Sequence, residues 1–140
     1  MIDFSTPLGK RAAEHLASDL CVWLTTIGAD GTPQPAPVWF LWEGASMLVY
    51  SQPIARRLKN IARSPKVSLH FDTDRDGSEV IVLTGPAALD PAAPTADKVE
   101  AYLAKYLEGI TSLGMTPASF AADYSVAFRV TPTKLRGHSG

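Results

Sequence analysis

The sequence predicts a mainly β fold with some α-helix, in which six or seven antiparallel strands curl into a barrel with helices at its periphery. Most apolar runs are short, rich in β-branched and aromatic residues, and separated by turn residues, and strands joined in this way usually pair antiparallel. The 140 residues are 46% hydrophobic, which suits one domain with a substantial core. We therefore treat residues 1–140 as one domain that ends in a C-terminal tail, residues 131–140.

The first elements are a helix and a strand that enters a hairpin. Residues 7–19 are predicted to be helical, because Pro7 suits an early helical position and Ser5 or Thr6 can cap it. Residues 20–27 are typical of a strand, and Asp30-Gly31 supplies the positive φ of a hairpin turn.

The predicted strand 34–42 has two unlike halves. Pro35 and Pro37 cannot donate to a sheet ladder, so the first half should lie at an edge or a bulge. The second half, Val38 to Trp42, is apolar on both faces. Such a strand must be covered on one side by its own core and on the other by something else.

The middle of the chain contains a strand, a basic helix and another strand. Residues 47–51 are predicted to be a strand and residues 54–63 a helix, whose Ile54, Leu58 and Ile61 should face the core. Ser64-Pro65 ends this helix, and residues 66–72 alternate as a strand does.

The remaining elements are less regular. Two helices are expected, a long one over residues 95–108 and a short one over residues 117–123, with an irregular segment between them. The predicted strands are residues 79–84, which continue as 87–89 after a Gly85-Pro86 break, and residues 124–130.

Bulk properties exclude several classes of protein. A net charge of −1 argues against a general nucleic-acid binder. The single cysteine, Cys21, rules out a disulfide framework and a thiolate zinc site, and we expect it to be buried. Because no apolar run approaches the length of a membrane span and the N-terminus is polar, we expect a cytoplasmic protein that contacts no membrane.

No arrangement of side chains for acid–base or nucleophilic catalysis is visible, so the catalytic residues are left unassigned. The three histidines have no partner at metal-ligand spacing. The carboxylates of residues 72–79 fit a solvated loop better than a cation site, and we expect no metal. If the protein is an enzyme, a cofactor performs the difficult step.

The stretch from Tyr50 to Asn60 is the best candidate for a binding site. Arg56, Arg57 and Lys59 lie in the first turns of the predicted helix, where cations are unfavourable unless an anion is near. Amide groups, helix dipole and guanidinium groups together can hold a phosphate. The alternative to a phosphate site is a basic helix face that is exposed to solvent and binds no ligand.

These features in this order resemble the pyridoxamine 5′-phosphate oxidase-like superfamily of flavin and deazaflavin oxidoreductases. The resemblance covers residues 10–90 and continues to Arg136; it rests on a Thr-x-Gly-Ala-Asp-Gly-x-Pro hairpin, a strand ending Tyr-Ser, an Arg-Arg-x-Lys-Asn helix and a Ser-Pro-Lys-Val-Ser-Leu strand. It implies a split β-barrel of the FMN-binding type that works as a homodimer, with the cofactor between subunits. A partner subunit would then cover the second face of strand 38–42.

The resemblance also implies a set of cofactor-binding residues. The phosphate would lie on Arg56, Arg57 and Lys59, and the strand end at Ser51 and Gln52 would touch the cofactor tail. The strand Val38, Trp39 and Phe40 would face the ring, although Trp39 and Trp42 fit core or dimer contacts as well. Arg136, within residues 134–137, would approach the ring, and residues 78–80 would reach the partner's site.

The Pro-Val-Trp-Phe strand and the compact length look most similar to the branch that uses the deazaflavin coenzyme F420. The C-terminal Trp-and-Arg segment of true pyridoxamine-phosphate oxidases is missing, which argues against oxidation of that substrate. Arg63 and Lys66 could meet the anionic F420 tail. We expect an F420-dependent oxidoreductase that transfers a hydride to an unsaturated small molecule. The alternatives are an FMN-dependent enzyme of the same fold or a non-catalytic binder of flavin, deazaflavin or haem.

Overall fold

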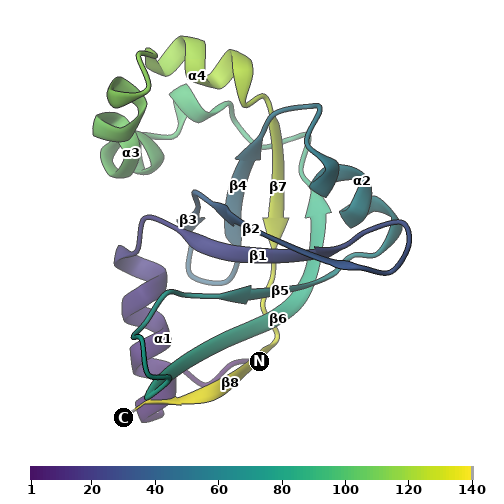
Figure 1. Ribbon diagram of the computed structural model, residues 1–140. Coiled ribbons are helices and arrows are strands. Elements are labelled where there is room, and N and C mark those ends of the chain that lie inside the picture. The colour runs from purple at the N-terminus through teal and green to yellow at the C-terminus, as the bar shows by residue number, and fades with distance from the viewer. Residues whose placement is uncertain (140) are drawn as a thin grey trace.

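The structure is a computed structural model that describes residues 1–139 (Figure 1). It contains the helices α1 (Pro7–Ser18), α2 (Arg56–Arg63), α3 (Glu100–Ser112) and α4 (Pro117–Asp123), and a short 3₁₀ helix, η1 (Ala96–Lys98). The strands are β1 (Val22–Ile27), β2 (Pro33–Val38), β3 (Leu41–Trp42), β4 (Met47–Ser51), β5 (Lys66–His70), β6 (Glu79–Leu89), β7 (Val126–Val130) and β8 (Lys134–Ser139). No helix in this part of the chain is long and apolar enough to span a membrane.

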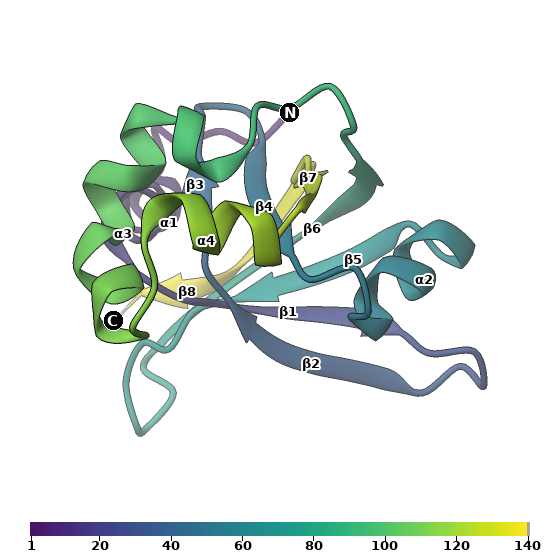
Figure 2. The same ribbon diagram turned by 90° about the horizontal axis from the view of Figure 1, so that it is seen from above.

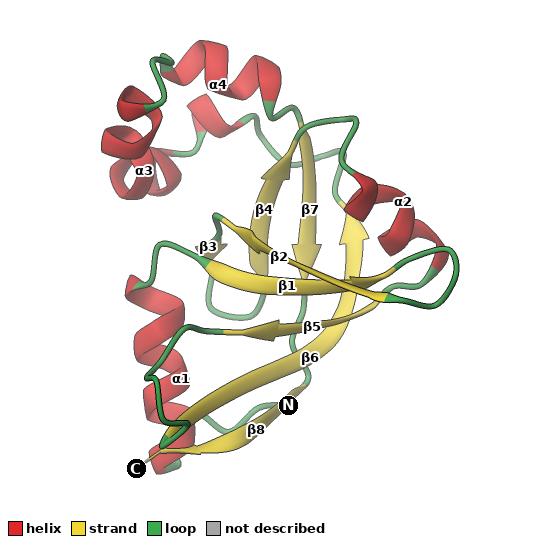
Figure 3. Cartoon of the chain, in the orientation of Figure 1, coloured by secondary structure: helices red, strands yellow, loops and turns green. Residues whose placement is uncertain are grey.

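One antiparallel sheet organises the chain, in the order β2-β1-β5-β6-β7-β4-β3, with β8 added beside β6 (Figure 3). The long strand β6 joins the two halves of the sheet, because its first part pairs with β5 and β8 and its last part pairs with β7. The sheet curls around an apolar core, and Figure 2 shows α3 and α4 lying together over one end of it. The predicted mainly β fold with peripheral helices is confirmed.

The predicted strand 34–42 is divided, because its side chains enter two different cores. Val38 and Phe40 pack into the barrel core, whereas Trp39 packs into a second cluster under α3 and α4. The chain therefore leaves β2 after Val38 and forms the two-residue strand β3. The second face of this stretch is covered by helices of the same chain, at least around Trp39.

The segment described as a C-terminal tail, residues 131–140, contains the strand β8, which the sequence did not indicate. Residues Lys134–Ser139 pair with Glu79–Thr84, because β6 offers an open edge there and Leu135 packs against the barrel core. Gly137 permits the close approach, since a Cβ at that position would lie 1.8 Å from the carbonyl oxygen of Val80. Gly140 lies outside the described residues.

Smaller differences concern helix ends and two side chains. The basic helix begins at Arg56, so Ile54 precedes it and is 88% exposed, while Leu58 and Ile61 pack against the core as predicted. Cys21 is exposed and not buried. Strand β6 continues through the expected break at Gly85, where the carbonyl of Thr131 approaches too closely for a Cβ. Helix α3 extends to Ser112, over part of the segment predicted to be irregular.

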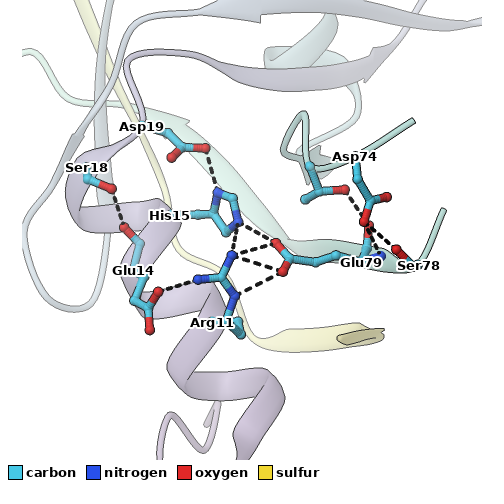
Figure 4. A network of polar contacts seen from close by, with 9 residues as sticks. Arg11, Glu14, His15, Ser18, Asp19, Asp74, Ser78 and Glu79 are labelled. Carbon is cyan, nitrogen blue, oxygen red and sulfur yellow. Dashed lines mark hydrogen bonds and ion pairs between the residues drawn. The ribbon is translucent and has the colours of Figure 1, made fainter. Parts of the chain in front are cut away.

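A polar cluster ties α1 to the start of β6 (Figure 4). The two ring nitrogens of His15 lie 2.7 Å from carboxylate oxygens of Asp19 and Glu79, and Arg11 donates two hydrogen bonds of 3.0 Å to Glu79. Burial alone would lower the pKa of His15, but the bonds to Asp19 and Glu79 outweigh it and raise the pKa above 6.5. The cluster therefore favours the imidazolium form.

We expect the stability of the protein to fall as the pH rises above 6.5 and through the folded-state pKa of His15. The folded state holds this proton more tightly than the unfolded state, so the stabilisation is complete below pH 6.5 and is lost above the folded-state pKa. Thermal unfolding midpoints across this range should show the fall in the wild type and in a His138→Gln control, whose histidine lies exposed on β8. A His15→Gln variant that shows the same fall would contradict this assignment.

Candidate functional site

Three hollows that share lining residues follow one another along β2 and α2, and together they are called the groove. The first, the aromatic pocket, has a volume of about 320 Å³ and is lined by Pro37, Val38, Trp39, Tyr50, Gln52, Ala55, Arg57, Tyr102, Leu113, Phe120 and Tyr124. The second, the central hollow of about 210 Å³, shares Ala55 and Arg57 with the aromatic pocket. The third, the basic hollow of about 490 Å³, shares Gln34, Arg56 and Asn60 with the central hollow.

The walls of the aromatic pocket are stacked rings. Trp39 lies parallel to Tyr106, with ring centroids 4.6 Å apart, and stacks on Phe120 at 5.7 Å. Phe120 stacks in turn on Tyr124 at 4.5 Å. Gly109 of α3 permits this arrangement, because a Cβ there would lie 3.0 Å from the indole of Trp39. The stack fixes the shape of the pocket wall, and a pocket lined by aromatic side chains is suited to an apolar ring system.

Arg57 is the cation where the aromatic pocket adjoins the central hollow. It is half-buried and donates a 3.1 Å hydrogen bond to Oγ of Ser51, which is fully buried at the end of β4. Burial lowers the pKa of Arg57, and no carboxylate among residues 1–139 forms an ion pair with it. A partly desolvated guanidinium without a counter-ion is a strong candidate to bind an anion.

The start of α2 adds backbone donors beside Arg57. Its N-cap, Ala55, offers no side-chain cap, and its first turn carries no acidic residue. The first amide groups of the helix therefore have no side-chain acceptor, and the positive end of the helix dipole lies at the same place. Because Ala55 lines both the aromatic pocket and the central hollow, an anion in the groove would meet this helix end.

Helical geometry separates Arg57 from the other predicted phosphate ligands. Arg56 and Lys59 lie three residues apart on one exposed side of α2 and line the basic hollow together with Arg63, whereas Arg57 points toward Ser51. The three cations predicted to act together thus lie along the groove, with Arg57 next to the aromatic pocket and Arg56 and Lys59 beyond it.

A buried asparagine fixes α2 against the sheet. Asn60 donates hydrogen bonds of 3.0 and 2.9 Å to Thr26 of β1 and Gln34 of β2, and its own oxygen accepts one from Arg63. Since Asn60 is buried and Gln34 borders two of the hollows, these bonds set the spacing of the groove walls.

Of the other predicted site residues, Val38, Trp39 and Gln52 line the aromatic pocket, and Ser51 lies behind Arg57. Phe40 does not line the groove. Its side chain is fully buried, its N–H donates to the hydroxyl of Tyr106 at 2.8 Å, and its carbonyl accepts from Lys105 at 2.9 Å. Lys105 is held over the Phe40 ring, and burial lowers the pKa of its amine to about 8.

Arg136 also lies away from the groove of its own chain. It is exposed on β8, opposite Val82 of β6. Val80, at the end of the segment predicted to reach the partner's site, lies on the same strand pair opposite His138. No group of His, Cys, Asp and Glu side chains within residues 1–139 could hold a metal ion.

Several residues that line the aromatic pocket are not among the cofactor-binding residues predicted from the sequence. Tyr50, Tyr102, Leu113, Phe120 and Tyr124 all line the aromatic pocket. The apolar pattern of α3 predicts a helix that buries Tyr102, but it does not indicate which part of the sheet that helix covers. Only the return of α3 and α4 over the end of β4 brings these side chains to Trp39.

Comparison with known proteins identifies the family of this fold. The sequence profile of pyridoxamine 5′-phosphate oxidase matches residues 8–139, nearly the whole described chain. No curated protein matches the sequence.

Similar solved structures share the fold at low sequence identity. A conserved hypothetical protein from Mycobacterium tuberculosis is 19% identical with a TM-score of 0.71, covering 93% of this chain and 83% of its own. A haem storage protein from Vibrio cholerae is 18% identical with a TM-score of 0.63, covering 94% and 95%. An F420 reductase is 23% identical with a TM-score of 0.62, covering 88% and 94%. At these identities the likeness shows the fold alone.

Replacing Asn60 by alanine should lower the free energy of unfolding by about 1–3 kcal/mol, because buried hydrogen-bonding groups lose their partner. Urea unfolding measures this change directly. A Lys59→Ala variant on the exposed side of the same helix is the control and should change the value by less than about 0.5 kcal/mol. Equal stability of the two variants would show that these bonds do not hold α2 in place.

Proposed function

The chain belongs to the pyridoxamine 5′-phosphate oxidase family, and we propose that it is an F420-dependent oxidoreductase that transfers a hydride between the deazaflavin and an unsaturated small molecule. The proposal rests on the environment of Arg57, a half-buried cation that has no carboxylate partner among residues 1–139 and lines an aromatic pocket. This arrangement fits a cofactor that joins a planar ring to a phosphate.

The phosphate would be held by Arg57 and by the first amides of α2. Charge-assisted hydrogen bonds from a guanidinium contribute about 1.5–3 kcal/mol each before screening. Ser51 accepts a hydrogen bond from Arg57 and so orients its side chain. Gln52 donates a hydrogen bond to Asp123 of α4 and lines the pocket beside Arg57. The residues present therefore fit a phosphate ester.

The ring would lie in the aromatic pocket, against Pro37 and Val38 of β2 and against Tyr50 of β4, with Trp39 and the helices that pack on it forming the rest of the wall. When bound, the deazaflavin supplies the hydride chemistry. The contribution of this chain is to orient the ring, to exclude water with Trp39, Leu113 and Phe120, and to hold its donor groups toward the pocket.

The basic hollow favours F420 over FMN. FMN ends at its phosphate, whereas F420 continues from the phosphate into an anionic tail. Arg56, Lys59 and Arg63 line the groove beyond Arg57, where such a tail would lie. Among the structural neighbours, one is an F420 reductase, which agrees with this choice, and another is a haem storage protein.

We expect two copies of the chain to pack through the outer face of the sheet. Trp23 of β1, Ser68 and His70 of β5, and Val82 and Thr84 of β6 are half-buried there, and none belongs to either core cluster. Arg136 and Val80 lie at the border of this face, so a partner subunit could bring them to the groove. The edge strand β2 carries Pro33, Pro35 and Pro37, which cannot donate to an added strand, so face-to-face packing is favoured over edge pairing.

Neutral replacement of Arg57 should weaken cofactor binding about tenfold or more, because it removes the charge that has no partner within the described chain. The measurement titrates F420 and FMN at equal concentration into the wild type, Arg57→Gln and an Arg75→Gln control, whose arginine lies exposed in the turn before β6. Unchanged affinity in Arg57→Gln would show that the phosphate lies elsewhere.

The same titration distinguishes the candidate functions. Tight binding of FMN without binding of F420 would contradict the F420 assignment. Binding of F420 without turnover of quinones, enones or tetrapyrroles by the reduced cofactor would indicate a non-catalytic carrier.

The wild type should be a dimer in light scattering, with an interface on the order of 1,600 Å². A Ser68→Lys substitution places a charge in the middle of the outer face and should yield monomers, while Thr111→Lys on the exposed side of α3 should not. A monomeric wild type would contradict a groove completed by a second subunit.

A further inference from the structure

The hydroxyl group of Tyr102 has no hydrogen-bond partner among residues 1–139, although the residue as a whole is buried. Its side chain projects from α3 into the second core cluster and is only 1% exposed. The hydroxyl makes no hydrogen bond to any other group of residues 1–139, although the residue lines the aromatic pocket. Hydroxyl groups of buried residues are nearly always paired, so this one is free to bind a ligand.

The other buried tyrosines show the contrast. Tyr50 donates a 2.6 Å hydrogen bond to the carbonyl of Pro94. The hydroxyl of Tyr106 accepts from Phe40 N–H and lies 2.7 Å from the carbonyl of Leu20. Both hydroxyl groups therefore serve the fold, whereas that of Tyr102 does not.

The Tyr102 hydroxyl is not sealed in the core, and the residue lines the aromatic pocket. No side-chain nitrogen or oxygen of the described chain is completely enclosed without a partner. Since Tyr102 has no partner and borders the aromatic pocket, its small exposed area lies at the pocket surface. Burial raises the pKa of Tyr102 well above its usual range, so the hydroxyl stays protonated and can donate.

We infer that Tyr102 donates a hydrogen bond to the carbonyl oxygen of a planar conjugated ring bound in the aromatic pocket. The aromatic side chains that line the pocket favour an apolar ring, and the neutral donor selects an uncharged or developing-anionic oxygen. Arg57, which also lines the pocket, would bind a group with a full negative charge, such as the phosphate. The catalytic role of Tyr102 rests on the proposed function. The binding experiment that tests the hydrogen bond does not depend on it.

In a hydride transfer, this donor acts on the oxygen that gains charge. The C–H bond at C5 of a bound reduced deazaflavin would break, its electron pair and hydrogen would form a C–H bond at the carbon β to the carbonyl of an enone or a quinone, and the deazaflavin would be left oxidised by two electrons. The π electrons of the C=C bond shift to form a new C=C bond at the carbonyl carbon, the C=O π pair moves to oxygen, and a proton from solvent completes the reduction. The hydrogen bond from Tyr102 strengthens as the oxygen becomes negative, which makes Tyr102 a catalytic residue for such a substrate.

The carbonyl belongs either to the cofactor ring or to the acceptor, and separate binding arms distinguish the two. The first arm titrates F420 and FMN without acceptor. The second titrates 2-methyl-1,4-naphthoquinone without cofactor, following quenching of tryptophan fluorescence and the infrared C=O stretch of the bound quinone. Each arm compares the wild type with Tyr102→Phe and Tyr106→Phe.

Tyr102→Phe should lower affinity about fivefold to tenfold in at least one arm, as expected for one neutral hydrogen bond. For the quinone, it should also shift the C=O stretch to higher frequency. Its thermal midpoint should not fall, because no intramolecular bond is lost. Tyr106→Phe should show the opposite pattern, with a lower midpoint and an unshifted C=O stretch.

Loss confined to the F420 and FMN arm assigns the carbonyl to the cofactor, and loss confined to the quinone arm assigns it to the acceptor. Wild-type affinity in both arms with an unshifted C=O stretch in Tyr102→Phe would overturn the inference while leaving the proposed function intact. Failure of the wild type to bind either cofactor would overturn the proposed function, and the quinone arm would still decide the role of Tyr102.

Discussion

The stretch from Val38 to Trp42 must satisfy two cores at once, and the rest of the structure depends on this constraint. Phe40 enters the barrel core while Trp39 enters the cluster under α3 and α4. The backbone between the two cores would be unpaired, but Tyr106 and Lys105 of α3 bind both polar groups of Phe40. Thus α3 is attached to the barrel at the point where β2 ends, and the aromatic pocket lies beside this attachment.

The polar groups of the structure divide into those that hold the fold and those that are available to a ligand. Groups that hold the fold are paired, as Asn60 is with Thr26 and Gln34. Within residues 1–139, Arg57 has no carboxylate partner and the hydroxyl of Tyr102 has no hydrogen-bond partner, and both residues line the aromatic pocket. A protein accepts the free-energy cost of such groups where a ligand completes them, which is why we read this groove as the binding site.

The long strand β6 connects the groove to the outer face of the sheet. It pairs with β8 in its first half and with β7 in its second half, so it links the C-terminal segment to the half of the sheet that carries β4. Arg136 therefore lies on the outer face and not in the groove of its own chain. The two parts of the predicted site meet only if a second copy of the chain supplies one of them.

The sequence by itself determined the mainly β architecture, the positions of most elements and the basic start of α2, because turn residues, alternation and helix signals act over a few neighbouring residues. It also indicated that Val38 to Trp42 is covered on both faces. Only the tertiary structure decided what covers Trp39, that Arg57 faces away from Arg56 and Lys59, and that β8 completes the sheet beside β6. These features depend on contacts between residues far apart in the chain, such as Trp39 with Phe120 and Val82 with Arg136, and no local pattern encodes which distant surface a helix or strand will meet.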